Sequence, residues 1–319
     1  FKRTGALLAP IDAREARSVA FASQVRSSLC HAADDRLPLR HCETRVQRID
    51  CCYINLDGAD VRRATLEQSF KRWMPADWRL RRFRAIDREY VRRHAVAGCL
   101  SDAEKACLLS HRHLIRESLD DPRPLLVLED DAMLGTRTCD ELEQLVALRD
   151  PCAWDLAFAD FLVPDVTSMV GLLRLRQQLP AGRIKLIDLR TLPFAGATAY
   201  MVNGRSKALL TLLLESETGF DVPYDILLSN LVRVRKLRAC GFFPFITSLS
   251  SLAETSEIQP VAKTAPLVWN AFRRLTWVDR DLVRERPRLQ ALASRFCDEE
   301  CAAFGTLFAA MASRELSSS

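Results

Sequence analysis

The chain has 319 residues, which is enough to bury a sizeable hydrophobic core. Hydrophobic residues make up 48% of it and charged residues 27%, as in ordinary soluble globular proteins, which argues against a fibrous or disordered class. The net charge of +5 is modest, and no apolar run approaches the ~20 residues that a membrane-spanning helix needs.

The cysteines and histidines indicate the cellular compartment of the protein and whether it holds a structural zinc site. The 11 cysteines include no CxxC pair, and all five histidines lie at or before His113, so local spacing offers no zinc signature. An odd number of cysteines in a chain of this length favours reduced thiols over a disulfide framework. We therefore expect a cytoplasmic protein.

The first segments in chain order predict an arm followed by a strand, a helix and a second strand. Residues 1–48 show little periodicity and are interpreted as an N-terminal arm. Residues 51–56 form a short apolar run that ends at Asp57-Gly58, which predicts a buried strand and a turn. Apolar residues then recur at helical spacing between residues 66 and 73, and alternation predicts a strand over residues 80–86.

Strands and helices continue to alternate in the middle of the chain. Ser101 and Glu104 form a capping-box pattern that predicts a helix running to about Leu119. Residues 124–128 then predict a buried strand that ends in three acids. The later expected elements are strands over 154–159 and 197–202 and helices over 205–215 and 224–235. This alternation indicates an α/β fold with a mainly parallel sheet.

From Pro266 onward the composition favours a helical C-terminal region. Three aromatic residues, Trp269, Phe272 and Trp277, are interspersed with Arg273, Arg274 and Arg280. Two interpretations remain open. The segment can pack on the main domain, or its basic, aromatic face can contact an anionic membrane at the periphery.

The acidic triplet Glu129-Asp130-Asp131 is the strongest chemical signal. It directly follows a buried strand, and the carboxyl ends of strands are where open α/β sheets bind ligands. Because strand side chains alternate, Glu129 and Asp131 should share one side and Asp130 should face away. Two hard oxygen donors on one side suit Mn²⁺ or Mg²⁺, although three acids can also simply solvate the start of a loop.

Three blocks in the right order make the chain resemble glycosyltransferase family 25, the lipopolysaccharide-biosynthesis glycosyltransferases related to the collagen galactosyltransferases. These blocks are Tyr53-Ile-Asn-Leu-Asp57 with Arg62-Arg63, Ser101-x-x-Glu-x-x-Cys-x-x-Ser-His111, and Leu126-Val-Leu-Glu-Asp-Asp-Ala132. Weaker similarity continues at 154–156, 199–202, 223–225 and 256–258. The resemblance implies a catalytic domain over residues 49–262, followed by a helical region over residues 263–319.

The resemblance implies a GT-A-like nucleotide-sugar-binding fold and an inverting hexosyltransferase. The expected donor is a UDP-sugar, typically UDP-galactose, and the expected acceptor is an oligosaccharide or glycolipid such as lipopolysaccharide core. The acidic triplet would take the DxD role at the diphosphate, with Glu129 and Asp131 as metal ligands. Two features depart from the family pattern: Ala106 replaces a glycine, and no histidine follows His113 to serve as a late metal ligand, so Asp225 or water would replace it.

By the same resemblance, several residues are candidates for the donor site, and each has an alternative interpretation. Asn55 and Asp57 would bind the nucleotide, or would form a turn that bonds its own backbone. Arg62 and Arg63 would meet a phosphate, or would lie on a solvated helix face. Asp130 completes the donor-site set through the DxD role.

Two further candidates lie on predicted helix and strand faces, and two carboxylates are candidates for catalysis. His111 and Tyr200 would contact the donor, or would be core residues. Asp225 would be the base that deprotonates the acceptor hydroxyl, with Asp131 as the second catalytic carboxylate. The alternative for Asp225 is a helix cap. Glu104 is not counted as a site residue, because the capping box with Ser101 accounts for its presence.

Other functional classes fit the sequence less well. A basic, aromatic stretch over residues 61–93 carries no recognised nucleic-acid-binding motif, so no nucleic-acid partner is expected. A catalytically inert relative that serves as a binding module remains an alternative, although the acidic triplet is intact. A metal-dependent nucleotidyl or phosphoryl transferase would be supported by a GxxxxGK[ST] loop, which this sequence does not contain.

Overall fold

The computed structural model describes residues 48–148, 153–255 and 264–311, which all belong to one unit spanning Arg45–Ser319. The expected N-terminal arm therefore lies outside the described residues, apart from Arg48. The weak family similarity at residues 256–258 also lies outside them.

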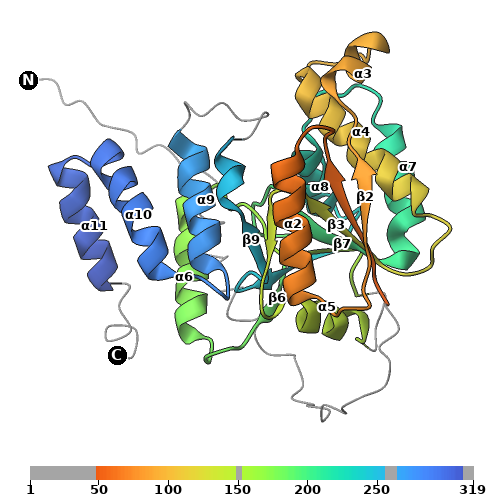
Figure 1. Ribbon diagram of the computed structural model, residues 1–319. Coiled ribbons are helices and arrows are strands. Elements are labelled where there is room, and N and C mark those ends of the chain that lie inside the picture. Colours follow the sequence, from red (N-terminus) through yellow and green to blue (C-terminus); the bar gives the residue numbers. More distant parts are fainter. Residues whose placement is uncertain (1–47, 149–152, 256–263, 312–319) are drawn as a thin grey trace, which may run out of the picture. The chain divides into compact units, whose positions relative to one another are not determined.

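A seven-stranded, mainly parallel sheet forms the centre of this unit, in the order β2-β1-β3-β7-β5-β8-β6 (Figure 1). Its strands are β1 (Asp50–Asn55), β2 (Leu80–Arg84), β3 (Leu125–Glu129), β5 (Leu156–Phe158), β6 (Lys185–Asp188), β7 (Ala199–Val202) and β8 (Ala239–Phe243). β1 is parallel to β2 and β3, and β5 is parallel to β8. β7 and β6 run antiparallel to their neighbours. The expected α/β class with a mainly parallel sheet is confirmed.

Helices surround the sheet, and a short two-stranded ribbon lies beside it. The described helices are α2 (Asp60–Trp73), α3 (Arg88–Arg93), α4 (Asp102–Glu117), α5 (Thr138–Val146), α6 (Val166–Gln178), α7 (Lys207–Ser216), α8 (Tyr224–Arg233), α9 (Thr264–Thr276), α10 (Leu282–Phe296) and α11 (Glu299–Met311). The ribbon pairs β4 (Ala132–Leu134) with β9 (Thr247–Leu249) in antiparallel orientation. None of the helices in the described ranges combines the length and hydrophobicity needed to cross a bilayer.

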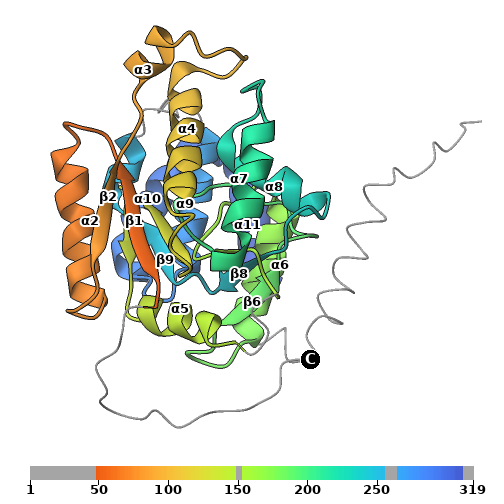
Figure 2. The same cartoon turned by 90° about the vertical axis from the view of Figure 1, so that its right-hand side faces the viewer.

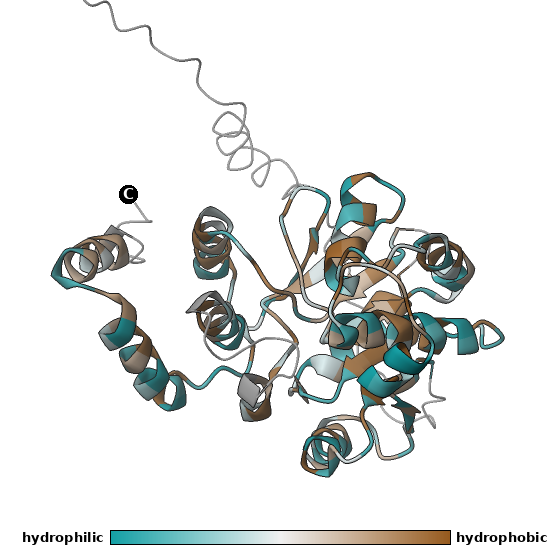
Figure 3. Ribbon diagram, turned by 90° about the horizontal axis from the view of Figure 1, so that it is seen from above, coloured by the Kyte–Doolittle hydropathy of each residue, from teal (hydrophilic) through white to brown (hydrophobic). Residues whose placement is uncertain are grey.

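The two faces of the sheet are covered by different helices. Cys51 and Tyr53 of β1 pack in one hydrophobic cluster with Leu66 and Phe70 of α2. On the other face α4, α7 and α8 lie together (Figure 2). Because successive strand residues point to opposite faces, each helix layer receives alternate side chains of the same strands. The central strands β3, β5 and β7 are consequently apolar and buried along nearly their whole length. Hydrophobic residues are concentrated in the interior of the fold (Figure 3).

The N-terminus of α4 is fixed by the capping box that the sequence predicts. The hydroxyl of Ser101 accepts from the amide of Glu104, and the Glu104 carboxylate accepts from the amide of Ser101. Such caps stabilise a helix by about 1 kcal/mol. The cap sets the register of α4, so Cys107 and His111, one helical turn apart, both face the sheet side.

The C-terminal helical region is confirmed, but α9 is part of the main packing rather than a separate appendage. The side chains of Arg273 and Arg274 are buried, which agrees with the interpretation of a segment packed on the main domain and not with that of a basic, membrane-facing surface. Arg273 pairs with Asp160, which follows β5, and Arg274 donates to the backbone oxygen of Ser250 after β9. These two arginines therefore cannot contribute to a membrane-facing surface.

Candidate active site

A cleft of about 720 Å³ opens at the end of β3 where the acidic triplet lies. Glu129 is the last residue of β3, and Asp130 and Asp131 form the turn into β4. Glu129 and Asp131 line the cleft, whereas Asp130 does not. The arrangement follows the alternation expected from the sequence. Two carboxylates of the triplet thus face one cavity.

Asp130 points to the neighbouring β1–α2 segment. Its Oδ2 accepts from Nδ2 of Asn55 at 2.9 Å, and its Oδ1 accepts from Nε of Arg62 at 2.6 Å. Arg62 also donates to Oδ2 of Asp131 at 2.9 Å and to the backbone oxygen of Leu252 at 3.0 Å. The guanidinium of Arg62 therefore holds the acidic turn in place. Its donors are engaged by the protein itself, and its expected contact with a phosphate stays a prediction.

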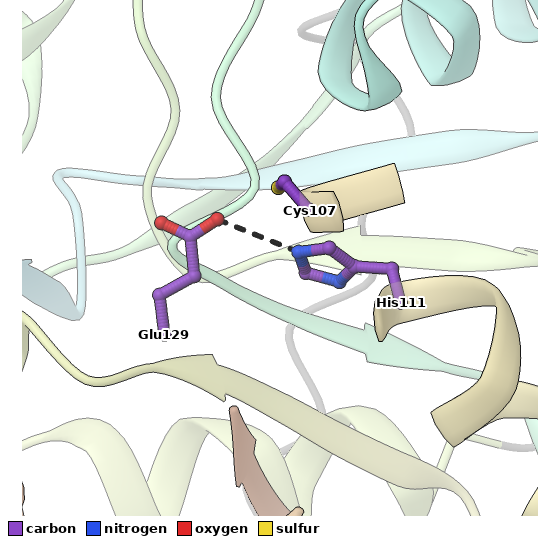
Figure 4. A group of neighbouring side chains, drawn as sticks. All are labelled: Cys107, His111 and Glu129. Atoms are coloured by element: carbon purple, nitrogen blue, oxygen red, sulfur yellow. Dashed lines mark ion pairs between the residues drawn. The ribbon is translucent and has the colours of Figure 1, made fainter. Parts of the chain in front are cut away.

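Glu129 is held from behind by a buried chain of polar side chains. Nε2 of His111 lies 3.5 Å from Oε1 of Glu129 (Figure 4). Nδ1 of His111 lies 2.9 Å from the Tyr200 hydroxyl, which lies 2.6 Å from the Tyr224 hydroxyl. The ring of His111 stacks on Tyr224 with a centroid distance of 4.1 Å. One set of donors satisfies this whole series of side chains: the Tyr224 hydroxyl donates to the Tyr200 hydroxyl, the Tyr200 hydroxyl donates to Nδ1 of His111, and Nε2–H of His111 donates to Glu129.

The positions of Tyr200 and His111 agree with the alternative of core residues, and a direct donor-binding role for them stays a prediction. Tyr200 is fully buried and His111 is 1% exposed, and neither side chain lines the cleft. Burial, followed by the adjacent Tyr224, raises the pKa of Tyr200 well above its ordinary value and keeps the phenol neutral. Both residues act on the cleft through Glu129.

Cys107 brings a thiol into the same cluster. Ligand atoms of Cys107, His111 and Glu129 lie within 4.8 Å of one another, and Cys107 also lines the cleft (Figure 4). Burial, with the nearby Glu129 and Asp225, raises the pKa of the thiol well above its usual value. A neutral thiol is a poor ligand for Mn²⁺ or Mg²⁺, which prefer oxygen. The cluster therefore fits the oxygen-liganded cation less well than the Glu129–Asp131 pair.

The environment of Glu129 and Asp131 suits a divalent cation. Oδ1 of Asp131 is buried and has no hydrogen-bond partner among the described residues. Burial, followed by repulsion from Glu129, raises the pKa of Asp131 to about 6. Burial also opposes the charge on Glu129, but His111, Arg273 and Arg62 outweigh it and lower the pKa of Glu129. A cation between two such carboxylates would satisfy the free oxygen and offset their repulsion.

Arg273 and Asp160 are components of the site that the sequence analysis missed. Nη2 of Arg273 lies 2.8 Å from Oδ1 of Asp160, and both side chains are almost completely buried. Arg273 lines the cleft. Its positive charge helps to lower the pKa of Glu129 and partly offsets the rise in the pKa of Asp131. Asp160 follows the expected strand over residues 154–159, and this position at a strand end was the available signal. Arg273 comes from a helix about 110 residues later, so no local pattern connects the two.

Asp225 also lines the cleft, in the first turn of α8. Its Oδ2 accepts from the amide of Gly196 at 2.8 Å, and its Oδ1 accepts from the amide of Ile226 at 2.9 Å. The N-cap of α8 is Pro223, so Asp225 does not cap this helix in the way considered from the sequence. The carboxylate is fixed in the cleft wall together with Glu129 and Asp131.

Two of the expected site residues lie elsewhere. Asp57 forms ion pairs with Arg82 and Arg84, and Arg63 pairs with Asp60. Neither Asp57 nor Arg63 lines the cleft. For Arg63, the alternative of a solvated helix face describes the observed position.

The chain matches the model of a known protein family. The model of glycosyltransferase family 25, described as an LPS biosynthesis protein family, matches residues 50–225, which is more than half of the chain. The matched segment contains the acidic triplet, His111, Tyr200 and Asp225, but not Arg273. A search of curated proteins finds no match. On the family match and the cleft that its segment forms, the chain belongs to glycosyltransferase family 25 and is a glycosyltransferase.

Proposed function

We propose that this glycosyltransferase moves a hexose, galactose from UDP-galactose, onto an oligosaccharide or glycolipid acceptor such as lipopolysaccharide core, with inversion and with a divalent cation. The observation that carries the proposal is the meeting of three carboxylates, Glu129, Asp131 and Asp225, in the walls of one cleft. The family provides the reaction class, and the cleft provides the groups that inverting transfer requires.

In the proposed reaction an acceptor hydroxyl oxygen forms a bond to the anomeric carbon while the bond to the UDP oxygen breaks. The proton of the hydroxyl passes to the carboxylate of Asp225, and the electron pair of the broken bond leaves with the diphosphate. Arg273 faces the cleft and places a buried positive charge beside the acidic turn. His111 keeps Glu129 oriented, and Arg62 does the same for Asp131.

Glu129 and Asp131 are the residues that would hold Mn²⁺ or Mg²⁺. When bound, the cation offsets negative charge that develops on the departing diphosphate. The chain's own contribution is to keep two carboxylates in one wall, with the Oδ1 of Asp131 free of other partners among the described residues.

The experiment that tests the proposal is calorimetric titration of UDP into the protein with MnCl₂ or with EDTA. Wild-type protein should bind UDP at least tenfold more tightly with Mn²⁺, because the cation links protein and phosphate. Glu129→Gln and Asp131→Asn should remove most of this metal dependence. Asp120→Asn changes an exposed acid outside the cleft and should behave as wild type. Equal UDP affinity of wild-type protein in Mn²⁺ and in EDTA would refute the metal assignment.

Thermal unfolding of the same variants without metal provides a second readout. Asp131→Asn should raise the melting temperature, because it removes a buried carboxylate that Glu129 repels. Glu129→Gln should not raise it, since the Glu129 carboxylate is stabilised by His111.

For the acceptor, the proposal places the enzyme at the cytoplasmic periphery of an anionic membrane. The supporting surface is different from the one expected around Arg273. Exposed apolar residues lie on α11, and exposed arginines lie on the adjacent α10. The apolar residues are Phe304, Leu307 and Phe308, and the arginines are Arg284, Arg286 and Arg295. Apolar insertion next to basic residues is the pattern by which helices bind anionic lipid surfaces.

A further inference from the structure

A second cavity, of about 620 Å³, lies between α2, the β4–β9 ribbon and the segment from α9 to α10. Leu249 of β9 belongs to the walls of both cavities. The consecutive residues Arg273 and Arg274 of α9 line the cleft and the second cavity, respectively. The second cavity therefore adjoins the cleft and is separate from its acidic turn.

The walls of this cavity are rich in arginine. Its arginines are Arg72, Arg274, Arg280, Arg284 and Arg288, and its acids are Asp279, Asp281 and Glu285. Two of the acids are used by the protein itself. Asp279 accepts from the amide and the hydroxyl of Thr136, both at 2.6 Å, and Asp281 caps α10. The third acid, Glu285, forms an ion pair with a lining arginine, Arg288, at 2.8 Å.

Three arginine charges are left without an acidic partner. Within the described residues, Arg72, Arg280 and Arg284 form no ion pair with a carboxylate. The guanidinium of Arg72 lies over the ring of Trp73, and Arg280 donates to the backbone oxygen of Leu275. Neighbouring arginines repel one another, and an anion that accepts bidentate hydrogen bonds relieves this repulsion.

Two buried donors in the same walls point to a ligand that is more than a bare anion. Oγ of Ser248 and Nε1 of Trp277 are buried and have no hydrogen-bond partner among the described residues. Both residues line the cavity, as does Trp73. An unpaired buried donor is destabilising, so these groups indicate a polar partner. Indole rings beside hydroxyl and arginine side chains match a sugar ring that carries an acidic substituent.

We propose that this second cavity binds an anionic saccharide, a sugar residue bearing a phosphate or carboxylate group, and anchors the acceptor beside the cleft. The class of ligand follows from the cavity walls. Its role as an acceptor subsite rests on the proposed function. The arginines bind the anion, and the indole rings and hydroxyl groups contact the sugar.

The test uses the full-length protein and four probes: glucose 6-phosphate, glucuronate, glucose and inorganic phosphate. Binding is followed by titration calorimetry at low and high salt. Wild-type protein should bind the two charged sugars, with affinity that falls as salt rises, and should bind glucose and inorganic phosphate at least tenfold more weakly. The double variant Arg72→Gln/Arg284→Gln should lose at least tenfold in affinity for the charged sugars. Both side chains are exposed and form no ion pair, so the fold should persist.

The matched control is Lys71→Gln/Arg286→Gln, which removes the same charge from the same two helices at exposed positions outside the cavity. It should bind the charged sugars as wild type does. Unchanged affinity in the Arg72/Arg284 variant, or equal loss in the control, would overturn the proposal. Equal binding of inorganic phosphate would also overturn it, because it would show an anion site that does not recognise sugar.

UDP titration of the same proteins separates this inference from the proposed function. The Arg72/Arg284 variant should keep wild-type UDP affinity. If wild-type protein bound UDP equally well with Mn²⁺ and with EDTA, the metal site would be refuted. The result for the charged sugars would still stand, because it is measured without UDP or metal.

Discussion

At the scale of single residues, the position of Asp225 is the main argument for its role as the base. Two other aspartates that precede Asp225 in the chain, Asp188 and Asp221, are alternative candidates for the base, but neither lines the cleft. Asp188 pairs with Arg190, and Asp221 accepts from the amide of Cys99 at 2.7 Å. Of the acids that line the cleft, Asp225 is the one outside the acidic turn and outside the capping box of α4.

Asp225→Asn should reduce the transfer rate by roughly 10²–10⁴, the range expected for the loss of general base catalysis. The amide keeps the size of the side chain and one of its two bonds to backbone N–H groups, but it cannot take the proton. UDP affinity should be nearly unchanged, so the loss appears in kcat. Steady-state kinetics with acceptor and UDP-sugar measures it, and Asp221→Asn, outside the cleft, provides the matched control. A normal kcat in Asp225→Asn would move the base to another residue.

The sequence predicted part of the site because that part follows local rules. Alternation at the end of β3 placed Glu129 and Asp131 in one wall and Asp130 away from it. The role of Arg62 in holding the turn depends on contacts 68 residues away in the chain, and no local pattern predicts them. For the same reason the burial of Tyr200 beneath His111 was one of two open interpretations, and only the packed structure distinguishes them.

At the scale of secondary structure, the sequence predicted the strands that are long apolar runs and did not predict the shortest strands. The expected strands over 51–56 and 124–128 correspond to β1 and β3 within one or two residues. The ribbon β4–β9 was not predicted, since each of its strands has three residues and gives no measurable period. β7 lies between β3 and β5 and is antiparallel to both. Its position and direction were likewise not predicted, because they depend on pairing with strands far away in the chain and not on the sequence of β7.

Asp155 connects three segments of the sheet and should matter for stability. Its Oδ1 accepts from the Ser206 hydroxyl at 2.7 Å, and its Oδ2 accepts from the amide of Arg238 at 2.7 Å. Asp155→Asn should lower the free energy of unfolding by roughly 1–3 kcal/mol at pH 7, because buried acceptors of charged donors are lost. Asp188→Asn is the control, since Asp188 makes a similar pair with Arg190 but is 43% exposed, and its loss should have little effect.

The pH dependence of this effect has a defined sign. Burial opposes the charge on Asp155, but the bonds from Arg238 and Ser206 outweigh it and lower the pKa. A depressed pKa in the folded state gives stability that is fully present above the unfolded value of about 3.9 and is lost as pH falls through the folded value. Denaturant unfolding should therefore show the wild type and Asp155→Asn converging below about pH 4. A constant difference from pH 7 to pH 3 would contradict the assignment.

At the scale of the whole molecule, the C-terminal helices divide into two functional parts. α9 belongs to the active site, because Arg273 pairs with Asp160 inside the cleft wall. Deletion of the whole region after Pro260 would therefore leave Asp160 buried without its cation, which is strongly destabilising. α11 is different, since every one of its side chains from Glu299 to Ala310 is exposed. A membrane test should remove α11 alone.

Protein truncated after Cys297 should lose retention on vesicles that contain anionic lipid, while full-length protein is retained at low salt and released at high salt. Phe304→Ser/Phe308→Ser should weaken retention for the same reason, because 52% and 61% of these side chains are exposed and available for insertion. Leu212→Ser, on α7 with 66% exposure, is the matched control and should bind as wild type does. Vesicle sedimentation measures retention, and UDP titration of the truncated protein should give wild-type affinity. Equal sedimentation of truncated and full-length protein would show that α11 is not the membrane contact, since removal of the apolar face would then have cost no binding energy.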